Sequence, residues 1–225
     1  MEPLMEAALG GKETSPCLLP DSGEQLSGAG ELVCLNKGSS LRDEAIYFPL
    51  DSAVSLTMVR GQARIPVGIA RRGDVVGVHQ VLLPSFPVLD AVVLRSGNAV
   101  RLGLGSLSRA LARDRSLYDR LLQYAYRTSA DFLSEAGASL ALSLEKRVAR
   151  WLASCCDALG SEALSVTHHD LAEFLGVRRS GVTVAMHVLE GDHVIRSSRG
   201  KVQILDRQAL SRFGGAFIPR RAQAS

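Results

Sequence analysis

Short apolar runs separated by turn residues fill the first half of the chain. Between Glu31 and Leu104 the runs are bounded by Gly, Pro and Asp at intervals of about 8–12 residues, a spacing typical of a small β-sandwich or barrel. The runs are Ala45–Phe48, Val54–Val59, Ile65–Ala70, Val75–Val78, Val88–Leu94 and Ala99–Leu104. This pattern predicts an N-terminal β-domain. Residues 1–22 have scattered Gly, Pro and Ser with little periodicity, which predicts a loosely packed arm.

From Ser106 onward the apolar positions change to spacings of three and four, which predict a long helix. One stripe along this helix consists of Leu117, Leu121, Ala125, Thr128, Phe132, Ala136 and Ser139. The stripe allows two interpretations: it packs against the chain's own β-domain, or it forms a seam with a second chain, since such spacing over about three heptads supports coiled-coil pairing. We favour the seam, because the module that follows works best in pairs.

A second helix is predicted over Ser143–Leu159. One face of it carries Leu144, Val148, Trp151, Leu152 and Cys155. Gly160 ends the helix, because glycine tolerates the left-handed conformation that closes many helices. Residues 161–164 follow as a short stretch that can pair as a strand.

The segment from Thr167 to Leu189 has the pattern of two helices that meet at a tight turn. Thr167 and Asp170 form a capping box at the start of a helix over His168–Leu175. Counted from His168, the apolar positions are 4, 8, 10, 15 and 18, a small residue is at 5 and a glycine is at 9: Leu171, Leu175, Val177, Val182, Ala185, Ala172 and Gly176. The small residue lets the helices approach and the glycine lets the chain turn, as a helix-turn-helix requires. The second helix begins at Arg178 or Arg179 and directs Val182, Ala185 and Leu189 inward.

A basic hairpin completes this C-terminal module. Val194–Arg196 and Lys201–Leu205 are predicted strands around a turn at Ser197–Gly200. Arg196, Arg199 and Lys201 supply charge suited to a wing that lies against a sugar–phosphate backbone. The net charge of +3 is distributed accordingly: residues 143–225 hold 12 Lys+Arg against 8 Asp+Glu, and the other residues hold 14 against 15. A basic end beside a neutral body suggests a phosphate-facing module.

Composition narrows the class of protein. With 46% hydrophobic and 22% charged residues over 225 positions, the chain is typical of a soluble globular protein. Apolar runs such as Ala138–Leu144 are too short to span a bilayer, and residues 1–22 lack a secretory pattern, so we expect a cytoplasmic protein without membrane contact. The cysteines match no zinc or iron–sulfur pattern and are expected to be buried thiols, so no metal and no cofactor is expected: Cys17, Cys34, Cys155 and Cys156.

Several stretches resemble the CRP/FNR family of bacterial transcription regulators. They are Leu171–Arg179, Leu189-Glu190, Arg199-Gly200 and Ile204–Asp206 in the C-terminal module, and Ala45–Pro49 and Arg72–Gly77 upstream. The resemblance implies an α+β protein with an N-terminal cyclic-nucleotide-binding-like β-roll (a double-stranded β-helix), a long dimerisation helix and a C-terminal winged helix-turn-helix. It also implies a DNA-binding transcription regulator that binds a two-fold-related site on double-stranded DNA as a homodimer.

The expected organisation follows from the patterns and the resemblance together. We expect an arm over residues 1–22, a β-roll sensor domain over 23–108, a dimerisation helix over 109–140, a winged helix-turn-helix domain over 141–213 and a tail over 214–225. RNA polymerase is a candidate further partner. The sequence leaves the small-molecule effector open.

The β-roll departs from the family members that bind cyclic nucleotide. In those members Gly-Glu precedes a short helix and Arg-Ser-Ala follows it; the glutamate accepts a hydrogen bond from the ribose, and the arginine pairs with the cyclic phosphate. Here Val78 follows Gly77, and Leu89-Asp90-Ala91 stands in place of Arg-Ser-Ala. An aliphatic side chain cannot neutralise a phosphate, and Asp90 would repel it. We therefore expect that the β-roll does not bind cyclic AMP or cyclic GMP in the usual way.

The second helix of the helix-turn-helix also departs from the family, whose Ser-Arg-Glu-x-x-x-Arg becomes residues 178–184 here. Arg179 keeps the first arginine, Ser180 replaces the glutamate that would accept from cytosine, and Val184 replaces the second arginine and could only contact a thymine methyl. Arg178 stands where a capping serine is usual, which leaves first-turn amides open to a DNA phosphate. The preferred base sequence should therefore differ from that of the cyclic AMP receptor.

These features assign roles to individual residues. Phosphate positioning is assigned to Thr167, Arg178, Arg199 and Lys201, and Arg196 adds to the charge of the wing. Base reading is assigned to Arg179, Ser180 and Thr183, with His187 as a further candidate.

Two other classes of function are the alternatives. An enzyme is not expected, because Gly103–Ser106 lacks the third glycine and the βαβ unit of a nucleotide-binding loop, and neither a nucleophile elbow nor paired catalytic carboxylates occur in the sequence. The second alternative is a ligand-binding module whose winged helix contacts protein instead of DNA.

Overall fold

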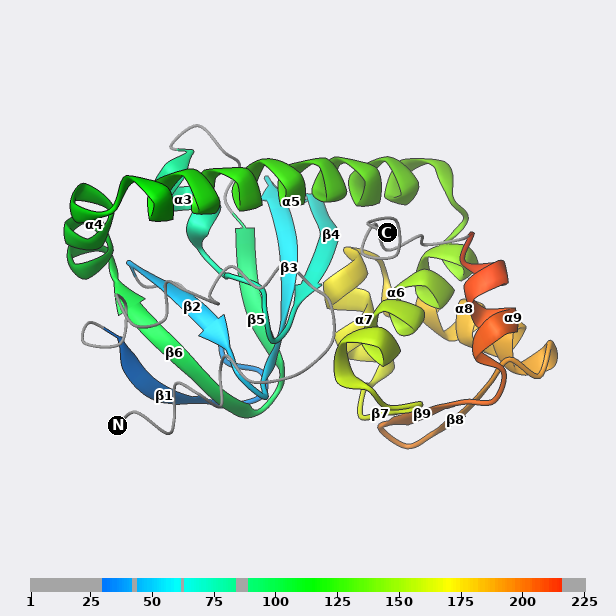
Figure 1. Cartoon of the computed structure of the whole chain (residues 1–225). Helices are drawn as coiled ribbons and strands as arrows, with labels where there is room; N and C mark the ends of the chain where they lie inside the picture. The colour runs from blue at the N-terminus through cyan, green and yellow to red at the C-terminus, as the bar shows by residue number, and fades with distance from the viewer. Residues whose placement is uncertain (1–29, 42–43, 62, 84–88, 216–225) are drawn as a thin grey trace. The chain divides into compact units, whose positions relative to one another are not determined.

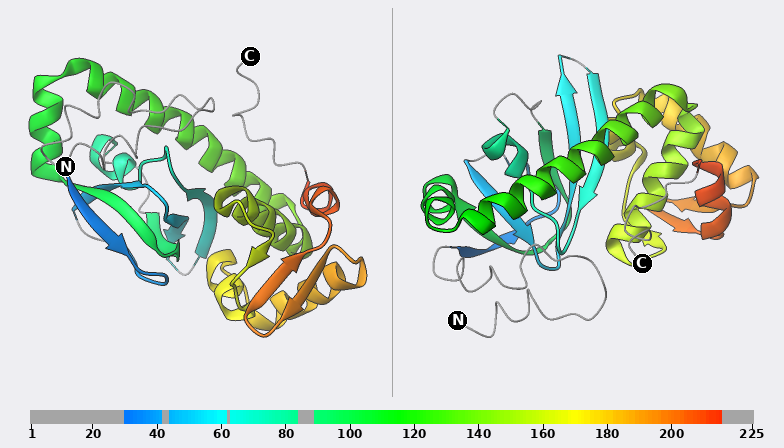
Figure 2. Two further views of the ribbon diagram at one scale, coloured as in Figure 1. Left: turned by 60° about the horizontal axis from the view of Figure 1, so that its bottom comes forward. Right: turned by 45° about the horizontal axis from the view of Figure 1, so that its top comes forward.

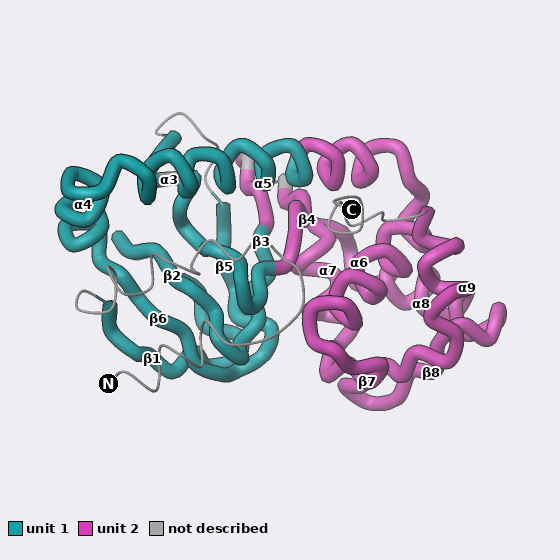
Figure 3. The backbone as a smooth tube through the Cα atoms, viewed as in Figure 1, with its two compact units in different colours: residues 1–56, 70–132 teal, residues 57–69, 133–225 magenta. Residues whose placement is uncertain are grey.

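The computed structural model describes residues 30–41, 44–61, 63–83 and 89–215 (Figure 1). The predicted arm over residues 1–22, Cys17 and the part of the predicted tail beyond residue 215 lie outside the described residues. The chain divides into two compact units, Met1–Leu56 with Ala70–Phe132, and Thr57–Ile69 with Leu133–Ser225 (Figure 3). Helix α5 (Arg115–Ala141) contributes residues to both units.

Short strands form the predicted β-domain. In one sheet the strand order is β1-β6-β2, with β6 antiparallel to both neighbours and Ile46 opposite Leu102. The other sheet has the order β4-β3-β5. The strands are β1 (Glu31–Leu35), β2 (Ala45–Pro49), β3 (Ala53–Arg60), β4 (Ala63–Ala70), β5 (Leu89–Arg95) and β6 (Gly97–Gly103). The predicted α+β class, with a β-domain, a long helix and a C-terminal helix-turn-helix, is confirmed.

The apolar run Val75–Val78 does not form a continuous strand. Val76 makes an isolated bridge to Tyr47, and the short helix α3 (Val78–Leu82) begins directly afterwards. Gly77 adopts φ +89°, a left-handed conformation that suits glycine and ends the extended backbone. The apolar run is buried for a different reason, since it contributes side chains to the core.

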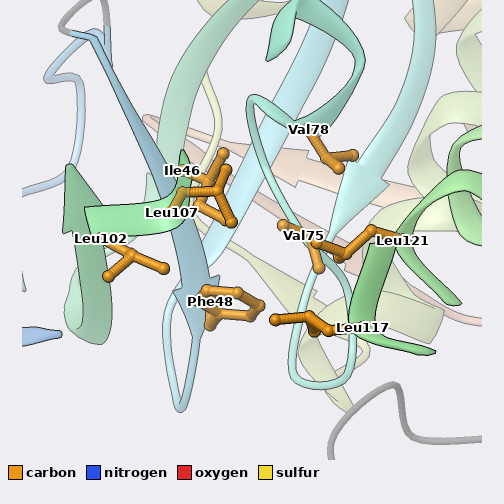
Figure 4. Close-up of a cluster of buried hydrophobic side chains, with 8 residues drawn as sticks. All are labelled: Ile46, Phe48, Val75, Val78, Leu102, Leu107, Leu117 and Leu121. Carbon is orange, nitrogen blue, oxygen red and sulfur yellow. The ribbon is translucent and has the colours of Figure 1, made fainter. Parts of the chain in front are cut away.

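A cluster of aliphatic side chains and one phenylalanine forms the core of the first unit (Figure 4). Its members come from β2, β6, the segment before α3, α3 itself, α4 (Leu104–Arg113) and α5: Ile46, Phe48, Val75, Val78, Leu102, Leu107, Leu117 and Leu121. A hydrogen bond also joins α5 to the segment before α3: the Tyr124 hydroxyl accepts from the Val75 backbone N–H at 2.9 Å. The long helix therefore supplies part of the hydrophobic core of the β-domain.

Four residues of the stripe predicted along the long helix pack inside this chain, so our preference for a seam is wrong for Leu117, Leu121, Ala125 and Phe132. Leu117, Leu121 and Ala125 are at most 1% exposed, and Phe132 is 6% exposed. The reason is that the β-domain needs apolar side chains from α5 to close its core. The large apolar side chains left exposed on α5 form a different stripe: Tyr126 is 77% exposed, Leu133 is 71% exposed and Leu140 is 83% exposed.

The second unit is mainly helical and carries a small sheet of order β7-β9-β8. Its elements are α6 (Leu144–Leu159), β7 (Ala163–Leu164), α7 (His168–Leu175), α8 (Arg179–Gly191), β8 (Ile195–Ser198), β9 (Lys201–Ile204) and α9 (Arg207–Phe213), and Figure 2 shows them from two further sides. Gly160 closes α6 in the left-handed conformation, as predicted. The apolar pattern did not predict α9.

The cysteines partly follow expectation. Cys155 and Cys156 are buried in α6, and burial raises the pKa of the Cys156 thiol to about 11. Cys34 is exposed, contrary to expectation, because it lies on β1 at the edge of its sheet. Among the described residues, no three His, Cys, Asp or Glu side chains group as metal ligands.

None of the helices in the described part of the chain is long and apolar enough to cross a membrane.

The side chain of His79 is buried in the first unit, where α3 meets α5. His79 is 3% exposed, and its Nε2 lies 2.8 Å from Thr128 Oγ1 and 3.1 Å from the Ala125 carbonyl oxygen. The Phe132 ring lies 4.9 Å away, centroid to centroid. Burial lowers the pKa of His79 below its usual value, and the bond to Ala125 only partly opposes this effect.

We expect acidification to destabilise the first unit through His79. Its pKa is lower in the folded than in the unfolded chain, so the unfolded chain binds the proton more readily. The stabilisation is complete above about pH 6.5 and is lost as the pH falls through the folded-state pKa. Thermal unfolding followed from about pH 7.5 to 5.5 should show a falling midpoint for the wild type and a shallower fall for His79→Gln.

His169→Gln is the matched control. Because the His169 side chain is 69% exposed, this variant should show the same fall of the unfolding midpoint with pH as the wild type. Equal slopes for the wild type and His79→Gln would contradict the assignment.

Candidate nucleic-acid interface

The start of α7 is fixed by a reciprocal pair of hydrogen bonds. Thr167 Oγ1 accepts from the Asp170 backbone N–H at 3.1 Å, and Asp170 Oδ2 accepts from the Thr167 backbone N–H at 2.9 Å. This confirms the predicted capping box. A hydroxyl that accepts such a bond keeps its own hydrogen to donate, so exposed Thr167 can still bind a phosphate oxygen.

The turn between α7 and α8 depends on Gly176. Gly176 adopts φ +63°, and the Val177 N–H returns to the Ala172 carbonyl at 3.0 Å. Arg147 of α6 donates from Nη2 to the Leu175 carbonyl at 2.7 Å, which satisfies an acceptor at the end of α7. The turn is thereby anchored to α6.

Apolar packing orients α8 within the domain. Its side chains Val182, Ala185 and Leu189 are fully buried, as predicted, and Met186 is buried with them, although the apolar pattern did not single it out. On α7 the buried residues are Leu171, Ala172 and Leu175. Gly181 permits a close approach to α6, because a Cβ there would lie 2.9 Å from Leu144 Cδ2.

The opposite face of α8 is exposed. Arg178 makes no side-chain capping bond at the start of the helix, as predicted. Between residues 178 and 189 the exposed positions are Arg178, Arg179, Ser180, Val184, His187 and Val188. Four of these were predicted to contact DNA, Val184 was predicted to reach only a thymine methyl, and Val188 was missed. Its signal in the sequence is its position four residues after Val184.

Thr183 is half-buried and links the two helices. Its hydroxyl donates to the Arg179 carbonyl at 3.2 Å, and His168 Nδ1 lies 3.0 Å from the same oxygen. With its one hydrogen used, the hydroxyl can only accept from a further group, such as a base amino group. Among the residues predicted to contact DNA, Thr183 is thus the one whose side chain is most restricted by hydrogen bonds within the domain.

The hairpin β8–β9 forms the wing. Ser198 pairs with Lys201 across a turn at Arg199-Gly200, where Gly200 has φ +75°. A Cβ on Gly200 would lie 4.0 Å from Thr167 Cγ2, so the structure brings Thr167 beside the turn of the wing. The three basic side chains of the wing are exposed: Arg196, Arg199 and Lys201.

A carboxylate joins the wing to the end of α8. Glu190 Oε1 accepts from the Ser197 backbone N–H at 2.7 Å and from the Ser197 hydroxyl, and Oε2 lies 3.4 Å from His187 Nδ1. The bonds from Ser197 hold the pKa of the Glu190 carboxyl below its usual value. Sequence reasoning missed this clamp, because the partner of Glu190 lies on the following strand.

Val78, Asp90 and Ala91 are the β-domain residues expected to bear on cyclic-nucleotide binding. Val78, at the position of the family's ribose-binding glutamate, is 0% exposed and belongs to the apolar core. Asp90 and Ala91 lie on β5, and the short Ala91 side chain is buried there. None of these side chains can donate to a phosphate.

Comparison with known proteins agrees with this geometry. Residues 146–213 match the family model of the Crp-like helix-turn-helix domain. A CRP/FNR-family transcriptional regulator from Thermus thermophilus has 23% identity and a TM-score of 0.65, with 82% of this chain and 98% of that chain covered. The comparison with curated proteins gives no match.

Two further solved structures share the fold. A protein of the Crp/Fnr family from Eubacterium rectale has 16% identity and a TM-score of 0.67, with 86% of this chain and 93% of that chain covered. FixK2 from Bradyrhizobium japonicum has 20% identity and a TM-score of 0.61, with 84% and 98% covered.

Proposed function

We propose that the chain is a transcription regulator of CRP/FNR type, and that it binds a two-fold-related site on double-stranded DNA as a homodimer. One observation carries the proposal. Eight of the nine residues assigned to DNA are exposed on one Crp-like helix-turn-helix domain: Thr167, Arg178, Arg179, Ser180, His187, Arg196, Arg199 and Lys201, with Thr183 half-buried.

Positioning on the phosphate backbone is proposed for Thr167, Arg178, Arg199 and Lys201, with Arg196 adding charge. The uncapped first turn of α8 supports this, because its amides can meet a phosphate. The proximity of Thr167 to the wing turn at Gly200 supports a shared contact with one strand. Base reading is proposed for Arg179, Ser180, Thr183 and His187, with Arg179 directed at a guanine edge.

A second copy of the chain is the proposed partner of α5. Tyr126, Leu133 and Leu140 recur every seven residues and are the large apolar side chains left exposed on that helix. Small residues, Ala130 and Gly137, follow the first two at a spacing of four and would let a partner helix approach. Pairing would present two reading helices to half-sites about one helical turn apart.

The signal that controls the regulator is proposed to be something other than cyclic AMP or cyclic GMP bound in the usual way. The apolar burial of Val78 and the carboxylate of Asp90 support this. RNA polymerase is a proposed further partner. Because the proposed target is chromosomal DNA, we propose that the protein is cytoplasmic. We also propose that it is a regulator without catalytic activity.

A salt-titrated gel shift on random-sequence and selected duplexes tests the proposal. A DNA reader is retained on a preferred sequence, with an affinity that falls steeply as salt rises. A winged helix that contacts protein instead would give neither retention nor salt dependence, and that outcome would overturn the proposal.

Replacing Arg179 should weaken binding selectively. Arg179→Ala should cost about 1–3 kcal/mol on the preferred site and relax its specificity, because the bidentate contact to guanine is lost. Lys201→Ala is the comparison: it should weaken all sequences about equally and lower the salt slope by about one. Fluorescence anisotropy with preferred and scrambled duplexes measures both, and unchanged binding by Arg179→Ala would refute its role.

The pairing face of α5 can be tested by placing a charge on it. Leu133→Glu should shift the protein from dimer to monomer in sedimentation experiments and weaken binding to the two-fold site, because the seam would bury two carboxylates. Ser134→Glu, at the adjacent exposed position, should remain dimeric. Since Leu133 is 71% exposed, the stability of each chain should change by less than about 0.5 kcal/mol. A dimeric Leu133→Glu protein would show that pairing occurs elsewhere.

Calorimetric titration with cyclic AMP should give no saturable heat. Val78 cannot accept a hydrogen bond from the ribose, and the Asp90 carboxylate would repel the phosphate of this ligand. The same preparation should bind its selected DNA, which confirms that the protein is folded. Tight, saturable binding of cyclic AMP would contradict the expectation.

A further inference from the structure

We propose that Val184 and Val188 form an apolar reading surface for the 5-methyl groups of pyrimidine bases in the major groove, chiefly those of thymine. The inference rests on the proposed function and deepens it, since it names the base feature that part of α8 recognises. It adds Val188 to the residues proposed to contact bases, and it assigns Val184 a favourable contact with a methyl group.

The two valines lie together on the exposed face of α8, opposite the face that packs into the core of the domain. Val184 is 60% exposed and Val188 is 40% exposed, whereas Val182, Ala185, Met186 and Leu189 are buried. Residues four apart are neighbours on a helix surface, so Ser180, Val184 and Val188 form one continuous ridge. Arg179 stands at the start of this ridge and His187 beside its end.

The chemistry of this ridge selects its partner. An exposed valine by itself is common on a protein surface, but here a pair follows Arg178 and Arg179 on the exposed face of α8, which the proposed function turns toward DNA. Valine has no donor or acceptor and can hold neither a phosphate nor a base edge through hydrogen bonds. In the major groove, the apolar group that B-DNA displays is the C5 methyl of thymine. A 5-methylcytosine carries the same methyl at the same carbon.

The surroundings keep the ridge rigid. A β-branched side chain has one strongly preferred χ1 rotamer in a helix, so valine loses little conformational freedom on contact. Thr183 is fixed between His168 and the Arg179 carbonyl on one side of the ridge. Glu190 fixes the end of the helix to Ser197. A methyl contact therefore depends on a surface that is already in place before binding.

The expected effect has a definite size. Removing from water one methyl group packed against a valine favours binding by about fourfold. We expect one or two sensitive thymines in each half-site, close to the guanine read by Arg179.

The test begins with selection of preferred duplexes by the full-length protein. Each thymine of the selected site is then replaced by deoxyuridine, which lacks only the methyl. The loss should be about fourfold at one or two positions per half-site and absent elsewhere. At a sensitive position, a 5-methylcytosine–guanine pair should bind more tightly than an unmethylated cytosine–guanine pair.

Protein variants complete a double-mutant cycle. Val184→Ala and Val188→Ala should each lose the preference for thymine over deoxyuridine at one position while keeping the fold, because both side chains are exposed and alanine favours helix. Leu205→Ala removes a comparably exposed apolar side chain, 48% exposed, that does not lie on α8, and should keep the full preference.

The outcomes separate this inference from the proposed function. Selected sites without thymine in the contacted half-site, equal affinity for uracil-substituted DNA, or valine variants that retain the methyl preference would overturn the reading of methyl groups and leave DNA binding intact. Complete absence of sequence-dependent, salt-sensitive binding would overturn both.

Discussion

Burial of one face of α8 against α6 and α7 is the packing on which the rest of the C-terminal domain depends. Val182, Ala185, Met186 and Leu189 leave water together, and each large side chain among them contributes about 1.5–3 kcal/mol. A helix that buries one face must expose the other, so this packing sets which side chains DNA can reach. Gly176 matters because its left-handed backbone makes the turn between α7 and α8, and Gly181 matters because it lets α8 approach α6 closely. The Glu190–Ser197 bonds extend the same frame to the wing.

The long helix α5 carries two apolar faces with different partners. One face closes the core of the β-domain through Leu117, Leu121 and Ala125, and the other remains exposed at Tyr126, Leu133 and Leu140. Since a helix turns through a full circle about every 3.6 residues, both stripes fit on it without sharing a residue. The helix that would pair two chains is therefore the same helix that stabilises the β-domain.

The first unit has the fold found in the solved structures that resemble it, and its interior at α3 is apolar. Val78 lies in the core, and His79 beside it is enclosed by Thr128, Ala125 and Phe132 of α5. A site for an anionic nucleotide requires donors, and these positions supply an aliphatic group and a weakly basic ring instead. Fold and ligand chemistry are separable here, because strand pairing and core burial depend on few of the residues that would touch a ligand.

The sequence by itself determined the features that arise from neighbouring residues. The capping box at Thr167, the ends of α6 and α7 at glycines, the inward face of α8 and the charges of the wing all depend on residues within one or two turns, so local pattern predicted them correctly. Only the tertiary structure decided which partner each stripe meets. Periodicity marked Leu117 and Leu121 as one apolar face, but it could not tell the chain's own core from a second chain. The same limit applies to the Thr183–His168 contact, the Glu190 clamp and the burial of Val78, because each depends on groups that folding brings together from separate elements.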